Sequence, residues 1–156
     1  MTNEQNKVNA RRIVDEGWNK HNTKLLDELF TNDATIHNPQ DPTIAKGPQG
    51  AKTSVETYLT AFPDLKITIE KEICEGDYVV QHLRAIGTNT GPFNGMPSTG
   101  KKANTTGAMT TKFDSHGKIV EVWSFFDNLG LMQQLGVVPT PEVATYKREP
   151  VLAGSR

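Results

Sequence analysis

The chain has 156 residues, a formal net charge of −1 and 35% hydrophobic residues, so it is long enough for one domain with a real core. Its Lys and Arg residues are scattered and form no basic stripe, which argues against nucleic acid or an anionic membrane as the main partner. The charged N-terminus lacks the apolar centre of a signal peptide, and no apolar run approaches the roughly 20 residues that a membrane-spanning helix needs.

Helical spacing of apolar residues dominates the first part of the chain. It predicts a helix over 3–20, a short one ending at Phe30 and a third over 47–62. Gly47-Pro48 opens the third helix, because a proline in the first turn lacks an N–H that the helix does not use. Between the second and third helices, 34–37 predicts a brief strand. Pro39 and Pro42 then predict a loop, since neither can donate a backbone hydrogen bond to a sheet.

After Leu65 the pattern is that of β-strands. The segments 66–74, 78–88, 102–114 and 117–128 are predicted strands, joined by short turns and by one long loop over 87–100. That loop is rich in Gly and Pro yet carries Phe93 and Met96. It either folds over the mouth of a pocket or packs on a neighbouring subunit. The Pro-interrupted, polar stretch 139–156 predicts an extended or mobile tail.

Helices followed by a run of strands predict an α+β domain over residues 1–138. We expect a strongly curved antiparallel sheet around a cavity, with three N-terminal helices packed on its open side. A cavity of this kind suits a small hydrophobic molecule as ligand.

The last predicted strand contains an unusual combination of residues. Its apolar residues are β-branched or aromatic, which is typical of a strand buried on both faces. Side chains alternate along a strand, so Trp123, Phe125 and Asp127 share one face. A carboxylate buried against apolar walls has a raised pKa and becomes a base able to take a proton from carbon beside a carbonyl. Alternatively, Asp127 caps a helix that begins at Asn128.

A strand that is apolar on both faces also bears on assembly. A cone-shaped domain covers only one face of its sheet, so the second apolar layer would form an exposed patch. We therefore expect a homodimer, with two-fold symmetry, through the convex face of the sheet.

Cysteine and histidine usage gives little sign of a metal. Cys74 is the only cysteine, so no disulfide forms within the chain, and a reducing cytoplasm suits it. His21, His37, His82 and His116 are distant in sequence and lack a ligand spacing such as HxxxH. No Gly-rich phosphate loop is present. We expect no metal, no cofactor and a cytoplasmic location.

A set of short motifs, in order along the chain, resembles the SnoaL-like polyketide cyclases. This family belongs to the superfamily of nuclear transport factor 2 and ketosteroid isomerase, whose fold is a conical α+β barrel. The motifs are Phe62-Pro63-Asp64-Leu65, Glu75-Gly76-Asp77, Gly87-Thr88-x-Thr90-Gly91, Pro97-x-Thr99-Gly100, Gly117-Lys118-Ile119-Val120-Glu121-x-Trp123, Asp127 and Gln134-Leu135-Gly136.

The resemblance implies a reaction and a site. Asp127 stands where these cyclases have the base that deprotonates a carbon between carbonyl groups. The resulting enolate attacks a second carbonyl of the same polyketide in an aldol reaction and closes a ring. His37 is the implied catalytic partner and Asn38 a polar guide. The implied apolar wall of the substrate site is Trp18, Phe62, Phe93, Met96, Met109, Trp123 and Phe125.

The sequence also departs from the family pattern. Asn89 stands where relatives commonly have His, and Ser98 where they have Pro. The strand that carries a catalytic His in the cyclases offers Met109, Thr111 and Phe113 here. These departures favour an alternative: a non-catalytic small-molecule-binding or accessory protein of the same fold.

Two sister activities of the superfamily fit the sequence less well. A ketosteroid isomerase would need a carboxylate where Asn38 stands and a Tyr where Val14 stands. The epoxide hydrolases need an Arg and an Asp where Leu83 and Ala85 stand.

Overall fold

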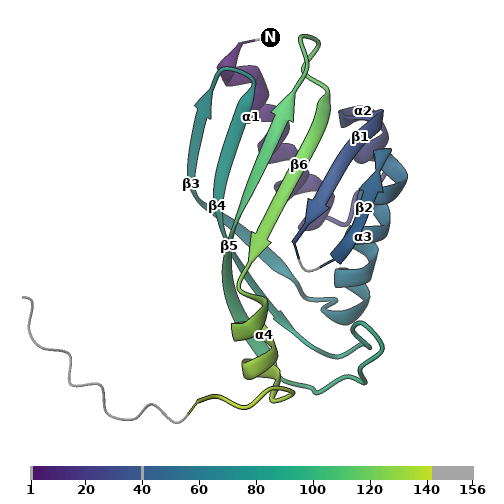
Figure 1. Ribbon diagram of the computed structural model, residues 1–156, viewed down its shortest axis with the longest axis vertical. Helices are drawn as coiled ribbons and strands as arrows, with labels where there is room; N and C mark the ends of the chain where they lie inside the picture. The colour runs from purple at the N-terminus through teal and green to yellow at the C-terminus, as the bar shows by residue number, and fades with distance from the viewer. Residues whose placement is uncertain (1, 40, 142–156) are drawn as a thin grey trace, which may run out of the picture.

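The computed structural model describes residues 2–39 and 41–141. Figure 1 shows three helices, α1 (Asn3–Arg12), α2 (Leu25–Leu29) and α3 (Gly47–Ala61), on one side of a curved sheet. A π-helical segment, η1 (Ile13–Trp18), continues α1, and a short helix α4 (Asn128–Leu135) follows the last strand. The predicted α+β architecture is confirmed, although the sheet does not close into a barrel.

The sheet has six strands in the order β2-β1-β6-β5-β4-β3. Four of them, β3 (Lys66–Glu75), β4 (Tyr78–Thr88), β5 (Lys102–Phe113) and β6 (Ile119–Phe126), match the predicted strands closely. These four strands form the predicted antiparallel sheet, and β1 (Phe30–Asn38) extends it by pairing with β6 in parallel. A parallel pair needs a long connection, and here the whole chain between the two strands supplies it.

The region between the second and third helices forms a hairpin rather than a loop. β1 is longer than the brief predicted strand, and β2 (Asp41–Lys46) pairs with it in an antiparallel arrangement. The prediction that Pro42 lies in a loop is wrong. A proline is compatible with β2 because this strand lies at the edge of the sheet, where one row of backbone N–H groups has no neighbouring strand.

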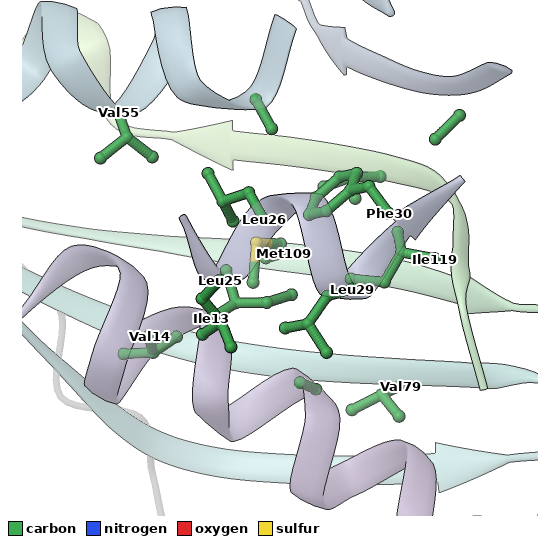
Figure 2. Close-up of a cluster of buried hydrophobic side chains, with 14 of the residues drawn as sticks. Ile13, Val14, Leu25, Leu26, Leu29, Phe30, Val55, Val79, Met109 and Ile119 are labelled. Carbon is green, nitrogen blue, oxygen red and sulfur yellow. The ribbon is translucent and has the colours of Figure 1, made fainter. Parts of the chain in front are cut away.

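The main core fills the space between the helices and the concave face of the sheet (Figure 2). Figure 2 shows side chains from η1 and α2, such as Ile13, Leu26 and Leu29, beside Met109 of β5 and Ile119 of β6. Each of these side chains is at most 6% exposed. Burial of such a side chain contributes about 1.5–3 kcal/mol, so this cluster is the main reason why the helices stay on the sheet.

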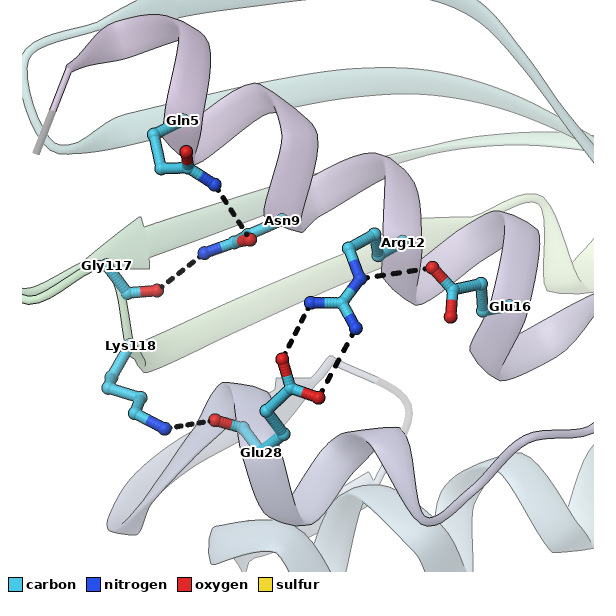
Figure 3. Close-up of polar contacts among 7 residues, drawn as sticks. All are labelled: Gln5, Asn9, Arg12, Glu16, Glu28, Gly117 and Lys118. Carbon is cyan, nitrogen blue, oxygen red and sulfur yellow. Dashed lines mark hydrogen bonds and ion pairs between the residues drawn. The ribbon is translucent and has the colours of Figure 1, made fainter.

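Polar contacts fasten α1 to the rest of the fold (Figure 3). Asn9 Nδ2 donates to the Gly117 carbonyl in the turn between β5 and β6, at 3.0 Å. Arg12 donates to Glu16 and, through two nitrogens, to Glu28 at the end of α2. These contacts fix the N-terminal helix against α2 and the turn between β5 and β6.

The long loop between β4 and β5 is held by one buried side chain, Asn89. Its Nδ2 donates to the carbonyls of Ala61 and Gly91, and its Oδ1 accepts from the backbone N–H and the hydroxyl of Thr99. Asn89 is 1% exposed, so these hydrogen bonds are shielded from water. The residue that departs from the family pattern therefore has a structural role here.

Candidate active site

A cavity of about 130 Å³ lies between η1, α3 and the concave face of the sheet. Its floor is made of small or aliphatic side chains on β3, β4 and β5, and its sides come from η1, α3, β1, β6 and the start of α4. The lining residues are Val14, Trp18, Ile36, His37, Asn38, Ser54, Tyr58, Phe62, Leu65, Ile67, Leu83, Ala85, Gly87, Ala103, Thr105, Met109, Ser124, Phe126, Asn128 and Leu131. This composition suits an apolar ligand with a few polar groups.

Three polar side chains meet at one corner of the cavity. The side chains of Tyr58 on α3 and Asn38 on β1 are hydrogen-bonded to each other. Ser124 lies on the neighbouring strand β6, one step beyond the pair His37 and Trp123 in the parallel register. Ser124 therefore lies beside Asn38 and faces the same cavity. We call Asn38, Tyr58 and Ser124 the polar corner.

The phenol of Tyr58 stays protonated at neutral pH. Burial raises the pKa of Tyr58, and the hydrogen bond with Asn38 offsets only part of that rise. The ring is held by Trp18 at a centroid distance of 6.0 Å and by Phe93 at 5.2 Å. A protonated, immobilised phenol is a suitable hydrogen-bond donor to a ligand oxygen.

Asp127 does not lie in the buried position that was expected for it. It is exposed, it is the N-cap residue of α4, and its Oδ1 accepts from the Gly130 N–H at 2.8 Å. The prediction that its carboxylate is removed from water and aimed at the cavity is wrong. The physical reason is the alternation along β6, which turns Ser124 and Phe126 inward and leaves Asp127 at the start of the helix.

The same alternation moves two predicted wall residues to the outer face of the sheet. Trp123 is 37% exposed and Phe125 is 48% exposed, and neither lines the cavity. The expectation that β6 is buried on both faces is therefore wrong for a single chain. The aromatic residue that β6 contributes to the cavity is Phe126.

His37 borders the cavity, but its ring belongs to the outer face. The imidazole stacks on Trp123 at a centroid distance of 3.9 Å, and its Nε2 lies 3.1 Å from Glu121 Oε1. Both contacts lie outside the cavity.

The other predicted site residues divide into two groups. Trp18, Asn38, Phe62 and Met109 line the cavity. Phe93 and Met96 do not line it, but they pack in a second cluster beside Phe62 and Tyr58. The long loop thus supports the cavity wall from behind, through contacts within its own chain.

Sequence reasoning missed Tyr58, Ser124 and Thr105 as site residues. Tyr58 lies in the helix predicted over 47–62, where an aromatic residue at helical spacing indicates a core position and gives no role to its hydroxyl. Ser124 and Thr105 are small polar residues in strands, a pattern that is common on solvated surfaces.

Within residues 2–39 and 41–141, no group of three or more His, Cys, Asp or Glu side chains is arranged to hold a metal ion. In the same part of the chain, no helix is long and apolar enough to cross a membrane.

The sequence from residue 8 to residue 135 matches the family model of the SnoaL-like polyketide cyclases. The chain belongs to this family. The match spans η1, the whole sheet and α4, so the cavity described above lies within the family domain. A comparison of the sequence with curated proteins finds no significant match.

Solved structures of family members have the same fold. A protein from Jannaschia sp. CCS1, assigned to the SnoaL-like polyketide cyclases, aligns with a TM-score of 0.78 and 26% identity over 87% of this chain and 94% of its own. A protein from Acidithiobacillus ferrooxidans, assigned as a polyketide cyclase, aligns with a TM-score of 0.74 and 30% identity over 85% of this chain and 95% of its own. IdmH from Streptomyces antibioticus, also assigned as a polyketide cyclase, aligns with a TM-score of 0.72 and 27% identity over 85% of this chain and 99% of its own.

Proposed function

We propose that this protein binds a small carbonyl compound of the polyketide type in its cavity and promotes ring closure of that compound. The observation that carries the proposal is the polar corner, where Asn38, Tyr58 and Ser124 meet in an otherwise apolar cavity. Within the described residues, the Ser124 side chain makes no hydrogen bond to the protein, so its hydroxyl is available to a ligand.

The polar corner suits the electrophilic half of an aldol reaction. When a nucleophilic carbon adds to a carbonyl, negative charge develops on the carbonyl oxygen. Donors already in position lower the energy of that transition state, most strongly where water is excluded. The Tyr58 hydroxyl is such a donor, because the raised pKa keeps its proton in place.

The other half of the reaction needs a base, and we propose Asp127 for that role. Asp127 precedes Asn128, which lines the cavity, and the family resemblance gives it this function. Its carboxylate now accepts from the Gly130 N–H, so it would have to leave the cap of α4 to reach a ligand. The proton that it removes from carbon would return to the new alkoxide, so the reaction needs no oxidant or reductant.

Heptane-2,6-dione is a suitable substrate for a test, because it is small, neutral and closes to a six-membered ring. A terminal methyl carbon loses a proton and bonds to the distant carbonyl carbon, and loss of water then gives 3-methylcyclohex-2-enone. We expect the protein to accelerate the rise in ultraviolet absorbance of this conjugated enone. Tyr58→Phe keeps the ring contacts but removes the donor, and should lower the rate by about 10²-fold. If the protein neither binds the diketone nor converts it, the proposal is wrong.

A second candidate function is binding without catalysis. It is favoured by one observation: among the described residues, no Asp or Glu side chain lines the cavity. Heptane-2,6-dione that binds in the cavity, with an affinity that falls in Tyr58→Phe but without conversion to the enone, would favour this candidate.

We also propose that the chain forms a homodimer through the outer face of the sheet. On this face Trp123 stacks between His37 and Phe125, at centroid distances of 3.9 and 5.9 Å. Tyr78 and Val80 of β4 are 43% and 37% exposed on the same face. Exposed aromatic side chains gathered on one face of a sheet commonly mark a contact with another protein, which supports a contact with a second copy here.

A further inference from the structure

A second polar position lies in the cavity, further along β5 from the level of Ser124. Thr105 of β5 and Asn128 of α4 both line the cavity there. Within residues 2–39 and 41–141, neither side chain makes a hydrogen bond to another residue. Polar groups that line an apolar cavity without a protein partner are available to a ligand.

The backbone fixes Thr105 and Asn128 beside each other. Asp127 N–H donates to the Thr106 carbonyl at 3.1 Å, which brings the start of α4 against β5. Further along the helix, the Gln134 side chain accepts from the Asn104 N–H and donates to its carbonyl. Thr105 is therefore held between two anchored neighbours. Along β5 it faces the same side as Ala103 and Met109, which also line the cavity.

The sheet register sets the separation between the two polar positions. Ser124 pairs with Met109, and Thr105 lies four residues from Met109 along β5. At about 3.3 Å per residue, Thr105 lies about 13 Å along the sheet from the level of Ser124. Leu83 and Phe126, which both pair with Gly107, lie between these two levels, and their side chains are apolar.

The cavity volume limits the size of the molecule that fits between these positions. A cavity of about 130 Å³ compares with an apolar protein cavity of about 150 Å³ that binds benzene. A molecule with one ring therefore fills the cavity. A hydrogen bond of about 2.8 Å at each end of this molecule extends its reach toward the two polar positions.

We propose that Thr105 and Asn128 form a second oxygen-binding subsite, and that the ligand is a single-ring molecule with oxygen functions at two opposite ends. This inference rests on the proposed function, because it takes the first oxygen to be the carbonyl held at the polar corner. Thr105 and Asn128 then select the ligand and fix its orientation, and they take no part in bond making.

Acetophenone and 4′-hydroxyacetophenone form a matched pair of probes, because they differ only in a hydroxyl opposite the carbonyl. We expect both ketones to bind, and the hydroxylated one about fivefold more tightly, as one added net hydrogen bond allows. Calorimetric titration below the pKa of the phenol measures both affinities. Thr105→Val keeps the shape of the side chain and should abolish the preference for 4′-hydroxyacetophenone without lowering the affinity for acetophenone. Asn128→Ala should reduce the same preference.

Thr106→Val is the matched control, because Thr106 is the exposed neighbour of Thr105 on the opposite face of β5. It should leave the fivefold preference intact. Equal affinity of the wild-type protein for the two ketones would overturn the second subsite while leaving the proposed function intact. If both ketones bind and Thr105→Val retains the preference, the subsite is also wrong. If neither ketone binds, the proposed function fails and the subsite with it.

Discussion

Asp127 carries two roles that can be separated by substitution. Its carboxylate caps α4 through the Gly130 N–H, and Asn caps a helix almost as well as Asp. Asp127→Asn should therefore leave the free energy of unfolding within about 0.5 kcal/mol of wild type, whereas Asp127→Ala should cost about 1 kcal/mol. Urea denaturation of the three proteins measures these differences.

Enone formation tests the second role of Asp127, that of the base. An amide cannot accept the proton from carbon, so Asp127→Asn should abolish enone formation from heptane-2,6-dione while retaining its binding. Tyr58→Phe provides the comparison, since it weakens binding and turnover together. An Asp127→Asn protein with full turnover would remove Asp127 as the base and leave it as a helix cap alone.

At the scale of the element, the loop between β4 and β5 supports the cavity through Phe93. Its ring lies 5.2 Å from that of Tyr58 and 5.7 Å from that of Phe62, and it is 4% exposed. The hydrogen bonds of Asn89 hold the loop in the position that these ring contacts need. Tyr58 thus depends on a segment that lies more than thirty residues further along the chain.

Phe93→Ala should lower the free energy of unfolding by about 3 kcal/mol, because it leaves a void in a packed cluster. It should also weaken acetophenone binding, since Tyr58 loses one of the two rings that hold it. Phe93→Leu retains most of the volume and is the control, with a smaller effect on both quantities. Unchanged stability in Phe93→Ala would mean that the loop does not pack on α3 in solution.

At the scale of the whole molecule, the outer face of the sheet leaves several large hydrophobic side chains of the described residues exposed in a single chain. If two copies meet there, light scattering should give about twice the chain mass of 17.2 kDa at micromolar concentration. Phe125→Asp places a charge at the centre of this face and should return the protein to the mass of one chain.

Val8→Asp is the control for this prediction. Val8 is 43% exposed on α1, which covers the concave side of the sheet, so the same substitution there should leave the mass unchanged. A wild-type protein with the mass of one chain would contradict the proposed dimer directly.

Local patterns in the sequence determined β3, β4, β5 and β6, the long helices and the family. β3, β4 and β5 could be predicted because their alternation and their turns depend only on neighbouring residues. α3 could be predicted because Gly47-Pro48 and Pro63-Asp64 mark its ends. The motifs from Phe62 to Gly136 identified the family for the same reason, since each is a short local feature.

Tertiary structure decided which face of β6 meets the cavity. The two faces of this strand are both apolar, so alternation alone could not say whether Trp123 or Phe126 points inward. The choice follows from the pairing of β6 with β1 and β5, whose partners lie far away in sequence. Pairing over such distances also brings Asn38, Tyr58 and Ser124 together, and it leaves Asp127 outside as a helix cap.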